Sequence, residues 1–97
     1  MILTGNAKAN FIKWCKQDAA WMDTYDNLFL FALIIDWLDS VGIITVVEPS
    51  YYDGWTFESY VYDKLENKHY VNVLSDSREE ATKSAIEKAN ELYNGQA

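Results

Sequence analysis

The sequence predicts a two-layer α+β domain, in which helices pack against a three-stranded antiparallel meander in the order α-α-β-β-β-α. Apolar residues recur at helical spacing near both ends of the chain. Three short segments between residues 43 and 74 instead alternate apolar and polar side chains or are rich in β-branched residues. A chain of 97 residues has the length of one domain, so we expect residues 1–97 to share a single core.

The first helix is expected over residues 6–20, because apolar residues follow the capping oxygens of Thr4 and Asn6 at helical spacing. Its apolar stripe is predicted to hold Ala7, Phe11, Trp14, Cys15 and Met22. Residues 23–27 then form a polar break with several side-chain oxygens that can cap the next helix.

The second helix is expected over residues 28–41, which are apolar on every side of a helix. The length of this run favours a helix over a buried strand, and Gly42 is well placed to end it in the left-handed conformation. Such a helix must be covered on more than one side, so it is either the central helix or part of a subunit interface. Asp36 and Asp39 share a face and are expected to mark its only solvent-facing edge.

The first strand is predicted over residues 43–48, which are rich in β-branched side chains, and Pro49 is expected to end it. A turn over residues 50–54, with an Asp-Gly pair, leads into the second strand at 55–63. A polar loop then leads into the third strand at 69–74.

Successive side chains of a strand point to opposite faces of the sheet, so the residues of these strands fall into two groups. The face toward the helices is predicted to carry Trp55, Phe57, Ser59, Val61, Val71 and Val73. The opposite face is predicted to carry Thr56, Glu58, Tyr60, Tyr62, Tyr70 and Asn72.

The last helix follows Asp76 and Ser77, each of which has a glutamate three residues later, the spacing of a capping box. Its apolar stripe is predicted to hold Ala81, Ala85, Ile86, Ala89, Leu92 and Tyr93. Asn94 and Gly95 are expected to end it.

A hairpin that ends in residues 69–73 leads into the last helix, and this helix has the pattern R-x-E-A followed by A-I-x-K-A. The matching residues are Arg78, Glu80, Ala81, Ala85, Ile86, Lys88 and Ala89. Together with the junction at residues 39–43, this part of the chain, residues 36–97, resembles small uncharacterised proteins carried by phages and prophages, such as the phage ABA-sandwich type. The resemblance implies a mobile-element setting and an accessory role, and it brings no catalytic residues.

The formal net charge is −7, and the imbalance lies in residues 25–63, which hold seven acidic residues and no Lys or Arg. A chain so short of basic residues is poorly suited to binding nucleic acid or anionic membranes. Its longest apolar run, residues 28–35, is far shorter than the stretch of about 20 residues that spans a bilayer. With no signal-peptide pattern either, we expect a soluble protein of the cytoplasm, that of the host cell if a phage encodes it.

The chain has one cysteine, Cys15, and one histidine, His69, so it can form neither an internal disulfide nor a zinc site of several Cys and His ligands. Its glycines are isolated and make no nucleotide-binding fingerprint. We therefore expect no metal and no cofactor. A Cys15–His69 pair brought together by the fold stays an alternative, against Cys15 as a small buried apolar side chain.

The candidate site residues form two groups. Tyr60, Tyr62 and Tyr70, with Glu58, are predicted to share the open face of the sheet, and rigid tyrosine-rich surfaces suit protein or ligand recognition. The alternative is that cross-strand tyrosines only stabilise a half-solvated sheet. Asp36 and Asp39 could act as a carboxylate pair in acid–base chemistry or cation binding, or could simply be the wet edge of an apolar helix.

Three functions are consistent with these features. The first is a non-enzymatic interaction protein that binds a partner protein, or a second copy of itself, through the tyrosine face or the apolar helix at 28–38. The second is an acidic inhibitor, such as a DNA mimic directed at a host nuclease or defence enzyme. The third is a binder of a small ligand, either a sugar or a cation. The sequence favours the first.

Overall fold

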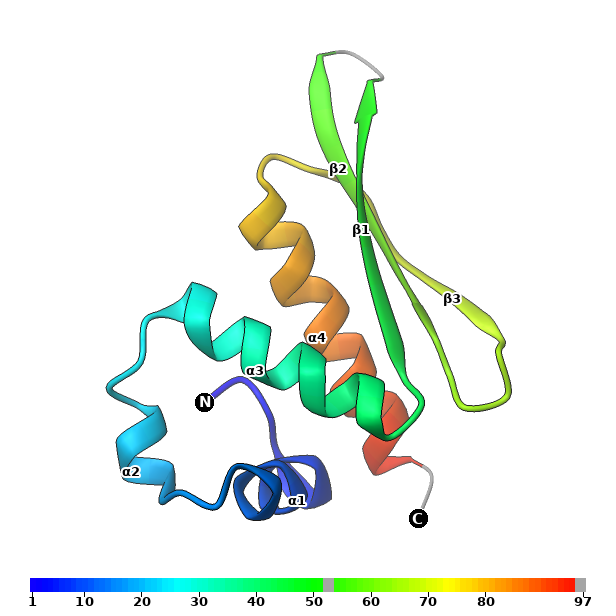
Figure 1. The fold of residues 1–97 in the computed structure, drawn as a ribbon. Helices are drawn as coiled ribbons and strands as arrows, with labels where there is room; N and C mark the ends of the chain where they lie inside the picture. The colour runs from blue at the N-terminus through cyan, green and yellow to red at the C-terminus, as the bar shows by residue number, and fades with distance from the viewer. Residues whose placement is uncertain (52–53, 96–97) are drawn as a thin grey trace.

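The computed structural model describes residues 1–51 and 54–95, and it has the predicted α+β architecture (Figure 1). Four helices and three strands follow one another in the order α1-α2-α3-β1-β2-β3-α4 in this part of the chain. The order is the predicted one with a short helix, α2, added near the N-terminus. Within the described ranges, no helix has the length and apolar character that crossing a membrane requires.

The prediction of a single helix over residues 6–20 is wrong for the residues after Cys15. Helix α1 runs over Gly5–Cys15 and α2 over Ala19–Met22. Lys16 between them takes a left-handed conformation with φ of 57°, and its N–H donates to the carbonyls of Ile12 and Lys13. This turn redirects the chain, so Met22 is buried as expected but from a different helix.

Helix α3 spans Asn27–Ser40 and has both of the predicted end signals. The Asp26 carboxylate accepts a hydrogen bond from the Phe29 N–H at 2.9 Å and caps the first turn. At the other end Gly42 has φ of 84°, and the N–H groups of Gly42 and Ile43 donate to the carbonyls of Asp39 and Leu38. This is the Schellman pattern, which places Ile43 in the core.

The sheet is an antiparallel meander in the order β1-β2-β3, as predicted. Strand β1 spans Ile44–Tyr51, β2 spans Trp55–Tyr62 and β3 spans Lys68–Ser75. Pro49 does not end β1, because β1 is an edge strand, where a missing N–H can be tolerated. The turn residues Tyr52 and Asp53, and the side chains of Asn72 and Val73, lie outside the described part of the chain.

Helix α4, Arg78–Asn94, lies along the sheet and packs against all three strands, and α3 and α1 pack against α4 and against each other (Figure 1). Of the two predicted caps, the Ser77 hydroxyl is the one observed, and it accepts from the Glu80 N–H at 3.1 Å. The helices therefore gather on one side of the sheet, and the opposite face of the sheet stays open.

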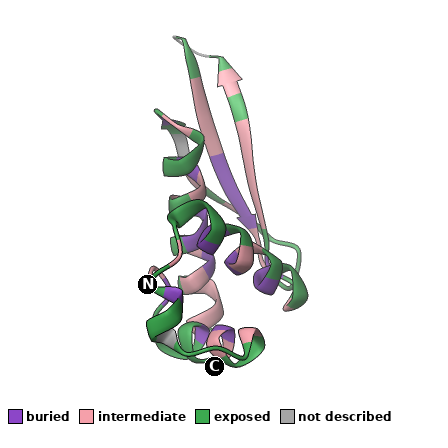
Figure 2. Ribbon diagram, turned by 60° about the vertical axis from the view of Figure 1, so that its left-hand side comes forward, coloured by how far each residue is buried: buried purple, intermediate pink, exposed green. Residues whose placement is uncertain are grey.

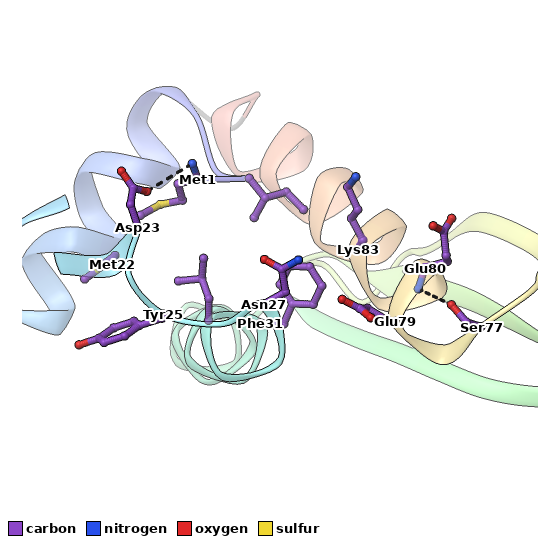
Figure 3. Close-up of a pocket in the computed structure, with 12 residues that line it drawn as sticks. Met1, Met22, Asp23, Tyr25, Asn27, Phe31, Ser77, Glu79, Glu80 and Lys83 are labelled. Atoms are coloured by element: carbon purple, nitrogen blue, oxygen red, sulfur yellow. Dashed lines mark hydrogen bonds and ion pairs between the residues drawn. The ribbon is translucent and has the colours of Figure 1, made fainter. Parts of the chain in front are cut away.

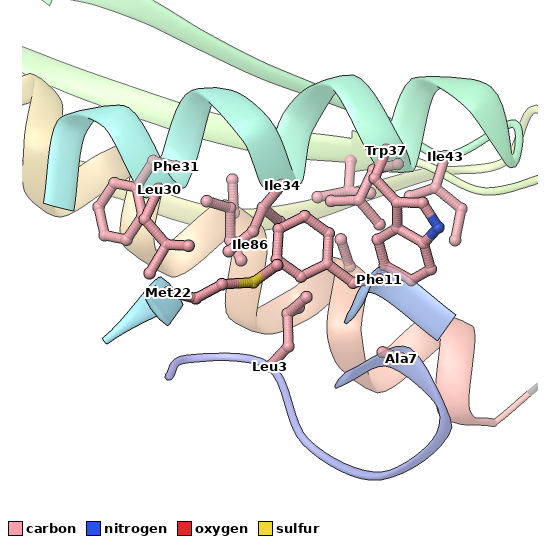
Figure 4. Close-up of a cluster of buried hydrophobic side chains, with 14 residues drawn as sticks. Leu3, Ala7, Phe11, Met22, Leu30, Phe31, Ile34, Trp37, Ile43 and Ile86 are labelled. Carbon is pink, nitrogen blue, oxygen red and sulfur yellow. The ribbon is translucent and has the colours of Figure 1, made fainter. Parts of the chain in front are cut away.

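The core lies between the helices, and Figure 4 shows its main side chains. Phe11 of α1, Trp37 of α3 and Ile86 of α4 are among its fully buried members. Rings are in direct contact here: Phe11 and Trp37 have centroids 5.8 Å apart, and Trp37 and Tyr93 have centroids 4.9 Å apart. Val61 brings the sheet into the same core.

One end of the hairpin β1–β2 extends past the helices, and its residues become more exposed toward that end (Figure 2). Trp55, predicted to face the core, is 70% exposed there and meets Tyr51 edge to face at 5.3 Å. That prediction was wrong because alternation assigns a face of the sheet, while burial also needs a helix over that face.

Candidate functional site

The strand register brings the predicted tyrosines together on the open face. Tyr60 lies directly opposite Tyr70 on β3, and Tyr62 lies opposite Lys68. On the other side of β2, Glu58 lies opposite Glu48 of β1. Side chains that are two apart on a strand share a face, so these six residues form one surface. We call it the tyrosine face: Glu48, Glu58, Tyr60, Tyr62, Lys68 and Tyr70.

Tyr60 lies at the centre of the tyrosine face and is only 9% exposed, although no described helix covers it. Its ring meets that of Tyr62 edge to face at 5.7 Å and that of Tyr70 at 6.1 Å. Its hydroxyl donates to the Glu48 carboxylate at 2.7 Å. This hydrogen bond, followed by burial, raises the pKa of Tyr60 to about 12. Tyr60 therefore lies on the predicted face but is not exposed there. The exposed aromatic surface belongs to its neighbours, above all to Tyr70, which is 69% exposed.

Lys68 covers the tyrosines from the β3 side. Its ammonium lies 4.0 Å from the centroid of the Tyr60 ring and 4.7 Å from that of the Tyr70 ring, both within cation–π range. A hydrogen bond with the Tyr70 side chain is the main cause that raises the pKa of Lys68. The charge pattern predicted an acidic surface, and alternation alone did not show that a lysine would lie over its aromatic centre.

Asp36 and Asp39 are not part of the tyrosine face. They are exposed side chains of α3. Partial burial, together with the neighbouring Asp36 charge, raises the pKa of the Asp39 carboxyl. They are solvent-facing as predicted, but they are not the only exposed edge of α3, because Leu28 and Phe29 are 69% and 50% exposed.

The turn between β2 and β3 is organised by Asp63. Its carboxylate accepts hydrogen bonds from the N–H groups of Leu65 and Asn67, and His69 Nε2 lies 2.9 Å from Asp63 Oδ2. These contacts, with His69 the largest, lower the pKa of Asp63 to about 2. His69 is thus engaged with an aspartate of its own hairpin, while burial raises the pKa of the Cys15 thiol in α1 and disfavours its thiolate.

A second surface, which sequence reasoning described only in part, lies at the far end of the helices. Trp21 and Tyr25 line one hollow of about 790 Å³, and the Tyr25 ring contacts the exposed Phe29 ring at 4.9 Å. We call this the helical-end surface: Trp21, Tyr25, Leu28 and Phe29. The aromatic residues and the apolar start of α3 could be read from the sequence, but the break at Lys16 that separates α2 from α1 could not.

A further hollow of about 580 Å³ lies between the N-terminal segment, the start of α3 and the start of α4 (Figure 3). Charged groups line it on the N-terminal side and on the α4 side. On the first, the Asp23 carboxylate lies 3.7 Å from the Met1 amine, and on the second are Glu79, Glu80 and Lys83. From the sequence, Glu79 and Glu80 were predicted only as capping partners at the start of the last helix, and no site was predicted here. The described residues hold no group of three or more His, Cys, Asp or Glu that could bind a metal ion.

Comparison with known proteins identifies no relative of this chain. No protein-family model matches the chain, and no curated protein or solved structure has a significant match to it.

Proposed function

We propose that this chain is a non-enzymatic interaction protein that binds a partner protein through the tyrosine face. The observation that supports this most is the one-sided packing: α4 packs against all three strands and α3 against β1, while no described helix covers the opposite face, which presents the exposed Tyr70 and the half-buried Tyr62. Exposed tyrosines offer a large contact area with few rotatable bonds, which suits them to recognition. The proposal includes the accessory role in a phage or mobile element that the sequence resemblance implies.

Site-specific photo-crosslinking tests this proposal. Benzoylphenylalanine replaces Tyr70 in one variant and Trp21 in another, two aromatic residues of nearly equal exposure at 69% and 65%. In extracts of the natural host cells, the variant at position 70 should crosslink a partner protein and the variant at position 21 should not. Crosslinking from position 21 alone would contradict the proposal.

A second candidate function, self-association, is favoured by a different observation. The helical-end surface leaves Trp21 65% and Leu28 69% exposed, and these large apolar side chains cost free energy when they face water. A second copy of the chain could cover them.

Sedimentation over a range of concentrations tests this second candidate. The mass of the native chain should rise with concentration, and Leu28→Lys should suppress the rise, because a charge would be buried in the contact. The matched control is Leu65→Lys, at a leucine 81% exposed in the β2–β3 turn, which should leave the rise intact. A native chain that stays monomeric at every concentration would remove this candidate.

A further inference from the structure

The aromatic centre of the tyrosine face already holds a cation. The Lys68 ammonium lies over the Tyr60 ring at 4.0 Å and over the Tyr70 ring at 4.7 Å. An ammonium this close to a ring face is attracted by the negative π surface. These rings therefore have the geometry of a site for a cationic side chain, with one of the chain's own lysines as its occupant.

The two glutamates of the tyrosine face point to the same chemistry. Glu48 and Glu58 are directly opposite on neighbouring strands, an arrangement of like charges that destabilises a sheet. Neither carboxylate forms a salt bridge with any described residue. Lys68 is the one base on this face, so the two carboxylates leave it with an excess of negative charge, which a basic partner would neutralise.

The hydrogen bond with Tyr70 and the two ring contacts are the interactions that hold Lys68 in place, and all of them can be exchanged for the same contacts with another ammonium group. Lys68 is exposed at the start of β3, it has no salt bridge within the described ranges, and its side chain is a flexible four-carbon stem. If the ammonium swung into solvent, the face of the Tyr60 ring would lose its cover. A cation from outside could then take the same position without any change in the backbone.

We propose that the tyrosine face recognises a lysine side chain of a basic partner protein, and that Lys68 occupies this position in the free chain and is displaced on binding. This inference rests on the proposed function, because it names the partner chemistry and the regulation of the same surface. Lys68 acts here as an internal competitor, so removing it strengthens binding.

A hexalysine peptide serves as the probe, and binding is followed by the ring chemical shifts of Tyr60, Tyr62 and Tyr70 in tyrosine-labelled protein. Lys68→Ala should tighten binding about two- to five-fold, the range that one cation–π contact at an exposed site supplies. The matched control is Lys83→Ala, which removes one positive charge from α4 and gives the same net charge. It should change the affinity less than Lys68→Ala does.

If Lys68→Ala unfolds the chain, Lys68→Thr provides a second variant, since threonine suits a strand. Equal tightening by the Lys68 and Lys83 variants would overturn the inference, because net charge alone would explain it. Weaker binding by the Lys68 variants, or hexalysine shifts confined to residues outside the tyrosine face, would overturn it as well. Crosslinking from position 70 to a partner, with no hexalysine binding, would leave the proposed function intact and refute only this inference.

Discussion

At the scale of single residues, Tyr60 shows how the open face is built. Its ring is shielded by Lys68 and its neighbouring tyrosines, and its hydroxyl is fixed by Glu48. Tyr60 therefore supports the rings of Tyr62 and Tyr70 beside it and adds little exposed area itself. Tyr62 and Tyr70 supply that area, and the Tyr60–Glu48 hydrogen bond ties β2 to β1 beneath them.

The ionisation of Tyr60 tests this view. Glu48→Gln removes the charged acceptor, so the pKa of Tyr60 should fall from about 12 toward its ordinary value of 10.0. Tyrosinate absorbance during an alkaline titration measures the change, and Tyr60→Phe assigns the late-titrating group. Glu66→Gln, at an exposed glutamate of the β2–β3 turn, is the control. An unchanged Tyr60 titration in Glu48→Gln would show that the hydrogen bond does not form in solution.

Asp63 should make the folded chain more stable at neutral pH than at acidic pH. Its folded pKa of about 2 lies below the ordinary value of 3.8, so its contribution is complete above that value and is lost as the pH falls toward 2. Asp63→Asn should lower the free energy of unfolding at pH 5, and the difference from the native chain should shrink steadily as the pH falls from 4 to 2. Urea unfolding at each pH measures this. A difference that stays constant over the range would contradict the role of Asp63 in the turn.

At the scale of elements, the two ends of the chain hold each other. Asn94 at the end of α4 accepts from the Ala7 N–H at 2.8 Å and donates to the Thr4 carbonyl at 3.0 Å. Helix α1 has no cap from the Thr4 side chain, so its first turn is capped by a different helix. Gly5 permits this approach, because it has φ of 58° and a Cβ there would lie 3.2 Å from Asn94 Nδ2.

Truncation of Asn94 should therefore cost as much as loss of a helix cap. Asn94→Ala is expected to lower the free energy of unfolding by about 1–2 kcal/mol. Asn94→Asp keeps the acceptor for Ala7 and should cost less. Denaturant unfolding followed by circular dichroism measures both, with Asn6→Ala on the exposed side of α1 as the matched control. A loss no larger than that of Asn6→Ala would refute the inter-helix cap.

The elements themselves were largely predictable, and the reasons differ between them. Helix ends with a strong local signal could be predicted because capping chemistry acts within a few residues. Gly42 was predicted as such, Ser77 was one of two predicted caps, and Asp26 lies within the predicted capping segment 23–27. The end of α1 at Lys16 was missed because lysine has no preference for the left-handed conformation. The role of Asn94 was missed because its partners lie at the other end of the chain.

At the scale of the whole molecule, the chain is thin, with a smallest extent of 17 Å. The described helices pack on one face of the sheet and on one another, so the other face of the sheet remains open. Of the described acidic residues of the middle segment, Glu48 and Glu58 lie on this face, Asp26, Asp36 and Asp39 lie at the start and on the surface of α3, and Asp63 lies in the β2–β3 turn. The bulk charge predicted a negative protein, but only the fold shows which acids stand beside exposed tyrosines. The helical-end surface could not be predicted, because it combines residues of α2 and α3 whose relative positions no periodicity in the sequence supplies.

One arrangement is central to the proposed function and to the further inference: an open face that presents Tyr70 while Lys68 shields Tyr60. Photochemically induced nuclear polarisation with a flavin dye tests it, because only tyrosine rings that the dye can touch become polarised. The account predicts a strong signal from Tyr70, none from Tyr60 in the native chain, and a Tyr60 signal that emerges in Lys68→Ala but not in Lys83→Ala. A silent Tyr70, or a Tyr60 as strongly polarised as Tyr70 in the native chain, would contradict it.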